Sequence, residues 1–125
     1  IETIPTGYIL MDGGAGSTVE FISGTRPIPM DRIDIVVAHA LAGQFLGMRL
    51  IYLEAGSGAK EPVSTSVIEA VSSAIDVPII VGGGINNPEL ARSAVEAGAS
   101  IIVTGTIIED NPDYMKEFAD AIHIR

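Results

Sequence analysis

The chain contains no cysteine, and this absence excludes several kinds of chemistry at once. Without thiols there can be no disulfide bond, no cysteine nucleophile and no cysteine-ligated metal. The absence is also typical of proteins of the cytoplasm, where disulfides are rare. We therefore expect a cytoplasmic protein that does not use thiol redox chemistry.

Basic residues are scarce as well. Seven Lys and Arg stand against 16 Asp and Glu, which gives a net charge of −9 at pH 7. Surfaces that bind nucleic acid gather Lys and Arg, and no such cluster occurs here, so we expect no nucleic-acid partner. An acidic protein that binds an anionic ligand must rely on local donors such as backbone amides, or on a divalent cation.

Long apolar runs and a sorting signal are also missing. The apolar runs at 79–81 and 101–103 are far shorter than the roughly 20 residues of a membrane-spanning helix. The opening Ile1–Pro5 has neither a basic start nor a long apolar core and is not a secretory signal. With 125 residues, 47% of them hydrophobic, we expect residues 1–125 to form a single unit with one core.

What the sequence does contain is four short apolar runs that alternate with helical patterns. Their near-continuous apolar character is typical of strands buried on both faces, as in a parallel sheet covered by helices. This order predicts an α/β fold. The predicted strands are Thr6–Met11, Leu50–Glu54, Pro78–Val81 and Ile101–Thr104.

Helix-start and helix-stop signals place the helices between these strands. An Asp, Ser or Asn begins each predicted helix, proline occupies the first helical position twice, and glycine ends two of them. The predicted helices run from Asp31 to Leu46, ended by Gly47, from Ser64 to Ala74, from Asn87 with Pro88 to about Gly98, and onward from Asn111 with Pro112.

The segment Asp12–Met30 departs from this rhythm. It opens on the flexible turn Gly13–Gly16, continues into a possible short strand at Thr18–Ile22, and ends in the stiff stretch Arg26–Pro29. We expect an excursion over one rim of the sheet and assign it no catalytic residue. A long loop without function is an equally open interpretation, although long irregular loops in compact domains are often functional.

Four strands cannot close a (β/α)₈ barrel, which usually has about eight strands and about 250 residues. The strands at Thr6–Met11 and Ile101–Thr104 would leave open edges, and open edges invite pairing with another chain. We therefore predict the parallel-stranded C-terminal half of a (β/α)₈ TIM barrel, cut from a longer chain whose N-terminal half-barrel is missing.

Two glycine-rich strand ends predict a phosphate site. Val81–Ile85 and Val103–Thr106 each lead toward a helix-start signal. Glycine has no Cβ, so the backbone can approach an oxyanion closely, and barrels commonly hold phosphate after their last two strands. The residues expected to line this site are Gly83, Gly84, Gly105 and Thr106. The alternative is that these glycines only permit tight turns.

Tyr52 and Glu54 lie two apart on a predicted strand and so share one face. At the carboxyl end of a barrel strand that face is the interior mouth, where Glu54 could accept hydrogen bonds from substrate hydroxyls and Tyr52 could donate one. The segment Gly56–Gly58 could add donors toward a phosphate. The competing interpretation is a satisfied buried carboxylate, since an unpaired buried Glu is costly.

The remaining polar residues carry little signal. His39 and His123 lie on or near helices, and we expect packing or solvent roles for both. Lys60 is a candidate cation at the rim of the site. No Ser/His/Asp arrangement and no histidine pair at metal-ligand spacing can be assembled.

Taken in order, these motifs resemble one known family. The segments Ile4–Ile9, Tyr52-Leu53-Glu54-Ala55-Gly56-Ser57-Gly58, Gly82–Ile85 and Val103–Thr106 look like the C-terminal half of geranylgeranylglyceryl phosphate synthase. The resemblance implies a modified (β/α)₈ barrel that transfers a geranylgeranyl group from geranylgeranyl diphosphate to sn-glycerol 1-phosphate. This reaction forms the first ether bond of archaeal membrane lipids.

The same resemblance implies a role for each matching residue. Glu54 and Tyr52 would act on the glycerol hydroxyls as the catalytic pair. The segment from Tyr52 through Leu53, Ala55, Gly56, Ser57 and Gly58 would hold glycerol phosphate, while the four glycine-loop residues named above take the phosphate.

The family resemblance also implies components outside these residues. Mg²⁺ would bind through ligands in the missing half, with no metal ligand in this chain, and the fragment alone would be inactive. A homo-oligomer and peripheral contact with the membrane, where the prenyl substrate is reached, are further expectations. Two alternatives stay open: another phosphate-binding TIM-barrel isomerase or synthase, and a noncatalytic half-barrel module.

Overall fold

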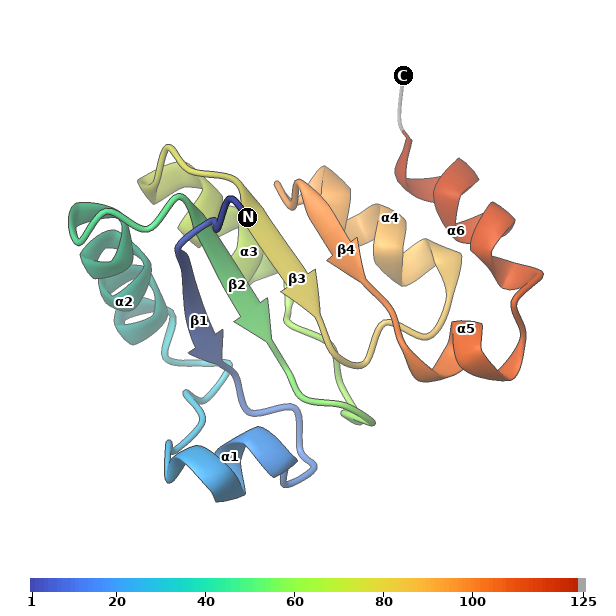
Figure 1. The fold of residues 1–125 in the computed structure, drawn as a ribbon, viewed down its shortest axis with the longest axis horizontal. Helices are drawn as coiled ribbons and strands as arrows, with labels where there is room; N and C mark the ends of the chain where they lie inside the picture. The colour runs from blue at the N-terminus through green and yellow to red at the C-terminus, as the bar shows by residue number, and fades with distance from the viewer. Residues whose placement is uncertain (124–125) are drawn as a thin grey trace.

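The computed structural model describes residues 1–123 and contains one parallel sheet of four strands (Figure 1). The strands follow one another in the order β1-β2-β3-β4, so each pairs with its neighbour in sequence. They are β1 (Thr6–Leu10), β2 (Leu50–Glu54), β3 (Ile79–Gly82) and β4 (Ile101–Val103). The predicted parallel α/β fold is confirmed, and the edge strands are β1 and β4, as expected.

Helices cover one face of this sheet and bury its apolar side chains. The covering helices are α2 (Ile33–Phe45), α3 (Thr65–Ala74) and α4 (Pro88–Glu96), and α6 (Tyr114–Ile122) packs beside α4 (Figure 1). Ile51, Leu53 and Val81 point toward these helices and are fully buried. The core therefore lies between the sheet and α2–α4. Within residues 1–123, no helix has both the length and the apolar character needed to cross a membrane.

The opposite face of the sheet carries no helix (Figure 1). Tyr8 is 46% exposed there, and Ile101 and Val103 on the edge strand are 44% and 41% exposed. In a closed barrel this face is the packed interior. The described chain thus presents a partly apolar sheet face to solvent, as half of a barrel would.

Several helix boundaries follow the predicted signals. Asn87 is the N-cap of α4, where its side chain accepts a 2.8 Å hydrogen bond from the Leu90 amide and Pro88 follows at the first position. Gly47 and Gly98, with φ of 91° and 120°, follow the ends of α2 and α4 in the left-handed conformation that favours glycine.

The predicted start of α2 at Asp31 is two residues early. The Arg32 amide donates to the Pro29 carbonyl at 3.0 Å, and this turn occupies the chain up to Arg32, so the helix begins at Ile33. Arg32 is the N-cap residue and makes no side-chain cap, while its guanidinium binds Asp34 at 2.9 Å.

The possible strand at Thr18–Ile22 is wrong: this segment is the helix α1 (Thr18–Ser23). The Ser17 side chain accepts a 3.1 Å hydrogen bond from the Glu20 amide, and Gly24 ends the helix with a φ of 63°. A Ser followed three residues later by Glu is a helix-start pattern that outweighs the β-branched residues between them. The excursion itself is confirmed, because Met11 bridges to Ile28 and returns the chain to the sheet.

The last helical region differs from prediction in two ways. A short helix, α5 (Thr106–Asp110), follows β4 directly, and α6 begins at Tyr114 rather than at Asn111. The Asn111 side chain accepts a 3.3 Å hydrogen bond from the Asp113 amide. Asn111 therefore shapes the turn between α5 and α6 instead of capping the second helix.

Candidate active site

All four strands point their carboxyl ends at the same edge of the sheet, where α1 and α5 also lie (Figure 1). The segments that follow the strands enclose a cavity of about 530 Å³, here called the strand-end cavity. This volume suits a small-molecule site. The lining residues are Tyr8, Gly16–Val19, Tyr52, Glu54, 56–59, 83–86 and 103–107.

Glu54 is the buried carboxylate of this cavity. It ends β2 and is only 8% exposed. The Gly56 amide donates a 2.8 Å hydrogen bond to Glu54 Oε1, so the carboxylate is held in place by the turn that follows its own strand. A fixed carboxylate beside a cavity can accept hydrogen bonds from a polyol or take a proton from a hydroxyl.

Tyr52 lies beside Glu54 on the same face of β2, as its spacing predicted. Burial raises the pKa of the Tyr52 phenol above its usual value of 10.0, and the neighbouring Glu54 carboxylate raises it further. Both effects disfavour the charged phenolate. The phenol therefore keeps its proton at neutral pH and is available as a hydrogen-bond donor.

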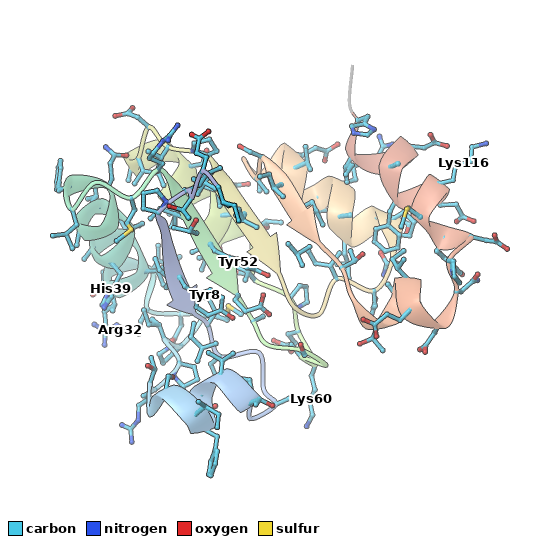
Figure 2. The ribbon with its side chains drawn as sticks, in the orientation of Figure 1. Tyr8, Arg32, His39, Tyr52, Lys60 and Lys116 are labelled. Carbon is cyan, nitrogen blue, oxygen red and sulfur yellow. The ribbon has the colours of Figure 1, made fainter. Side chains whose placement is uncertain are left out.

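Tyr8 is a site residue that sequence reasoning missed. It pairs with Tyr52 across β1 and β2, and the two rings meet edge to face with centroids 5.1 Å apart (Figure 2). Burial and the Glu54 carboxylate also raise the pKa of the Tyr8 phenol. The signal was available, because Tyr8 occupies on the first strand the place that Tyr52 occupies on the next.

The glycine loops after β2 and β3 meet at Glu54. Gly83 has a φ of 84°, and a Cβ added to it would lie 2.7 Å from Glu54 Oε1 and 2.7 Å from the Gly56 nitrogen. Gly84, with a φ of 72°, packs as tightly against the Pro62 backbone, at 2.9 Å. Tight turns and close packing therefore require both glycines, and their contact with phosphate stays a prediction.

Gly105 differs from these two. It has a φ of −121°, and a Cβ added to it would meet no heavy atom within 4 Å. Its packing in the described chain does not demand glycine, and both Gly105 and Thr106 border the strand-end cavity. The open space beside Gly105 is what close approach of a ligand to the backbone would need.

The structure brings most of the predicted site residues together. Tyr52, Glu54, Gly56, Ser57, Gly58, Gly83, Gly84, Gly105 and Thr106 all line the strand-end cavity. Leu53 and Ala55 do not: side chains alternate along the strand, and theirs are 0% and 2% exposed in the helix-facing core. We correct these two side chains from substrate contacts to core packing.

Three further residues lie away from the lining. His39 is exposed on α2, where its Nδ1 lies 2.8 Å from the Ile35 carbonyl oxygen, and His123 is exposed after α6. Lys60 is exposed and extends on the side of α1 (Figure 2). It does not border the cavity, and its role at the rim stays a prediction.

The excursion contributes to the cavity, although sequence reasoning assigned it nothing. Gly16, Ser17, Thr18 and Val19 form part of the lining. Ser17 packs against the turn after β2, because a Cβ added to Gly56 would lie 3.2 Å from the Ser17 Cβ. The start of α1 at its N-cap Ser17, where the sequence predicted a possible strand instead, thus also places these residues at the cavity.

Acidic residues do not gather into a metal centre in the described part of the chain. Among residues 1–123 no group of three or more His, Asp or Glu side chains is placed to hold a metal ion. Glu54 is the carboxylate that borders the cavity, and its Oε1 already accepts the Gly56 amide.

Parallel strands in sequence order, helices on one face and a cavity at the strand ends define this chain as part of a (β/α)-barrel protein. Within that class, the chain belongs to the PcrB family, whose model matches residues 1–122. The family resemblance read from the motifs is thereby confirmed.

Known relatives agree with this assignment. Geranylgeranylglyceryl phosphate synthase of Chitinophaga pinensis is 50% identical over 123 residues, covering 98% of this chain and 49% of the relative. The enzyme of the same name from Methanopyrus kandleri is 52% identical over 122 residues, with 98% and 50% covered. The chain therefore spans about half the length of the curated relatives it matches.

A solved structure matches the fold closely. It is (S)-3-O-geranylgeranylglyceryl phosphate synthase from Thermoplasma acidophilum in complex with substrate sn-glycerol-1-phosphate. The TM-score is 0.90 at 40% identity, and the match covers 98% of this chain and 50% of that chain.

Proposed function

We propose that the protein containing this chain is a prenyltransferase that moves a geranylgeranyl group from geranylgeranyl diphosphate to sn-glycerol 1-phosphate. The product carries the first ether bond of archaeal membrane lipids. The observation that carries the proposal is the strand-end cavity, in which Glu54 and Tyr52 lie beside the glycine loops. Relatives with this activity in their names, and one bound to sn-glycerol-1-phosphate, support it.

Each part of the cavity has a role in this proposal. Glu54 accepts a hydrogen bond from a glycerol hydroxyl and is the proton acceptor when the primary hydroxyl attacks the allylic carbon. Tyr52 keeps its proton and donates to a substrate oxygen. The backbone at Gly83, Gly84 and Gly105, with the Thr106 hydroxyl, holds the phosphate through N–H and O–H donors.

Mg²⁺ is part of the same proposal, with ligands that lie outside the described residues. One carboxylate at the cavity with an oxygen already bound is too small a donor set for a cation that takes about six oxygen ligands. We propose that the other half of the barrel supplies the ligands. When bound, the ion would neutralise charge on the leaving diphosphate.

The whole protein is proposed to be larger than this chain. An N-terminal half-barrel would cover the open sheet face at Ile101 and Val103 and bring the diphosphate-binding residues. The chain alone would then be inactive. A homo-oligomer of complete barrels is part of the same proposal.

We also propose a cytoplasmic protein with peripheral contact to the membrane. Geranylgeranyl diphosphate is an amphiphile whose long apolar chain favours a lipid surface. Helix α1, whose first turn lines the strand-end cavity, exposes Phe21 and Ile22 by 86% and 76%. An apolar side at the rim of the site suits contact with that surface.

The substitution Glu54→Gln tests the reaction. It keeps the shape of the side chain but removes the charged acceptor, so we expect kcat/KM for sn-glycerol 1-phosphate to fall by an amount equivalent to about 1.5–3 kcal/mol. Steady-state transfer of a labelled prenyl group, with Mg²⁺ and the complete protein, measures this loss. Glu61→Gln, an exposed change on the following loop, is the matched control.

Three outcomes separate the alternatives. Unchanged kinetics in Glu54→Gln would refute the role of Glu54. Binding of sn-glycerol 1-phosphate without any transfer from geranylgeranyl diphosphate would favour a noncatalytic module. Failure to bind this compound, with binding of a phosphosugar instead, would favour another barrel isomerase or synthase.

A further inference from the structure

The backbone conformation of Gly82 does not explain why this position is a glycine. It is the last residue of β3 and lies directly opposite Glu54 in the register of β2 and β3. It is buried, does not border the strand-end cavity, and is not among the glycines with positive φ. An alanine could adopt this backbone without strain, unlike at Gly83 or Gly84.

Two side chains of β2, those of Tyr52 and Glu54, leave no room for a side chain at position 82. A Cβ added to Gly82 would lie 2.6 Å from the Tyr52 hydroxyl and 2.8 Å from Glu54 Oε2. It would also lie 3.1 Å from the Tyr52 Cε2 carbon. The polar ends of Tyr52 and Glu54 therefore both reach the space that a side chain on β3 would occupy.

Of these two side chains, Tyr52 has the greater freedom to move. Glu54 Oε1 is held by the Gly56 amide at 2.8 Å, and the turn at Gly83 packs against the same oxygen. The Tyr52 ring is half-buried and touches Tyr8 edge to face. A methyl group at position 82 would therefore displace the phenol and pull it away from the carboxylate.

We propose that Gly82 is a positioning residue: its lack of a side chain lets the Tyr52 hydroxyl and the Glu54 carboxylate converge at one point of the strand-end cavity. Gly82 acts only through these two groups. The inference rests on the proposed function in one respect, namely that the converging groups recognise the hydroxyls of glycerol phosphate.

Gly82→Ala in the complete protein tests the kinetic part. We expect KM for sn-glycerol 1-phosphate to rise about tenfold or more, because at least one hydrogen bond to the polyol is misplaced. KM for the prenyl diphosphate should change less than about twofold, since Gly82 acts only through Tyr52 and Glu54, which are proposed to contact the glycerol hydroxyls. A uniform loss of kcat with both KM values unchanged would overturn the inference.

Gly7→Ala is the matched control. Gly7 is also a strand glycine without positive φ, and a Cβ there would lie 2.8 Å from Ile51 Cδ1, on the helix-facing side of the sheet. The crowding is similar, but Tyr52 and Glu54 are not touched. A rise in KM for sn-glycerol 1-phosphate as large as in Gly82→Ala would show a general packing effect and would refute the positioning role.

A double-mutant cycle tests the geometry without any activity. Tyr52→Phe removes the hydroxyl closest to the added methyl group, so Gly82→Ala should lower the melting temperature less in the Tyr52→Phe background than in the unaltered protein. Additive shifts would overturn the inference. If transfer activity is absent but the coupling is found, the proposed function fails while the positioning of Tyr52 stands.

The cycle also covers failure to fold. If Gly82→Ala does not fold, the double variant Gly82→Ala/Tyr52→Phe should recover a cooperative melting transition. Loss of folding in both variants would mean that the Tyr52 hydroxyl is not the obstacle, and the inference would be wrong.

Discussion

Glycine is present at different positions of this site for different physical reasons. Gly83 and Gly84 are required by positive φ and by contacts below 3.0 Å, whereas Gly82 is required only by neighbouring side chains. Gly105 is required by neither. A glycine-rich sequence therefore marks a site of close approach, but the object approached differs from one position to the next.

The Tyr52 phenol predicts a pH dependence of stability. Because its pKa is raised above 10.0 in the folded chain, the folded state holds the proton more tightly than the unfolded state. This contribution is complete below pH 10 and is lost as the pH rises above it, where the unfolded phenol ionises first. The loss for one such group is at most about 1.4 kcal/mol per pH unit.

Urea unfolding at about pH 9 and about pH 10.5 measures this effect. The free energy of unfolding should fall less between these values in Tyr52→Phe than in the unaltered protein. Tyr114→Phe, a change on α6 away from the strand-end cavity, controls for the loss of any tyrosine. Equal pH slopes in the unaltered protein and in Tyr52→Phe would contradict the shift.

At this scale the sequence predicted what depends on strand periodicity and missed what depends on pairing. Tyr52 and Glu54 follow from a period of two along one strand, which also carries Leu53 and Ala55 to the core. Tyr8 and Gly82 gain their roles from the strands beside them. The register that places them opposite Tyr52 and Glu54 forms only when the sheet does.

Among the secondary-structure elements, α1 has ends that the local sequence predicts and a position that only tertiary contacts determine. Its cap at Ser17 and its end at Gly24 are local and legible in the sequence. The β-branched residues Thr18, Val19 and Ile22 favoured a strand, but the capping pattern prevailed. That α1 would border the strand-end cavity could not be read locally, because the bridge between Met11 and Ile28 determines where the excursion lies.

The exposed side of α1 predicts binding to lipid. If Phe21 enters a bilayer surface, Phe21→Ala should weaken partitioning of the complete protein onto phosphatidylcholine vesicles by about tenfold, since burial of one aromatic side chain is worth about 1.5–3 kcal/mol. Co-sedimentation over a range of lipid concentrations measures the change.

Phe45→Ala is the matched control for this experiment. Phe45 is 80% exposed at the end of α2, at the other end of the sheet from α1 (Figure 1). Its loss should leave partitioning unaltered. No partitioning of the unaltered protein, or equal losses in both variants, would count against membrane contact through α1.

For the molecule as a whole, strand number and order were predictable, but the covering of the open face was not. Four apolar runs separated by helices lead to four parallel strands in sequence order, because short connections and right-handed crossovers leave little choice. The same sequence says only that edges β1 and β4 and the face at Ile101 and Val103 need a partner. In the proposed whole protein, the N-terminal half-barrel supplies this partner.

The open face predicts self-association of residues 1–125 when they are produced alone. Burial of exposed apolar side chains and pairing of edge strands favour association, so light scattering should give a mass above the 13.0 kDa of one chain. Val103→Lys places a charge on that face and should shift the population toward the single-chain mass. The control Leu46→Lys, which changes an apolar residue that is 79% exposed after α2, should leave the mass unchanged.

Because the other half-barrel would compete for this surface, adding it should also dissolve the assembly and restore transfer activity. A stable 13.0 kDa species at all concentrations, indifferent to Val103→Lys, would mean that the exposed strands need no partner, and the half-barrel proposal would lose its physical basis.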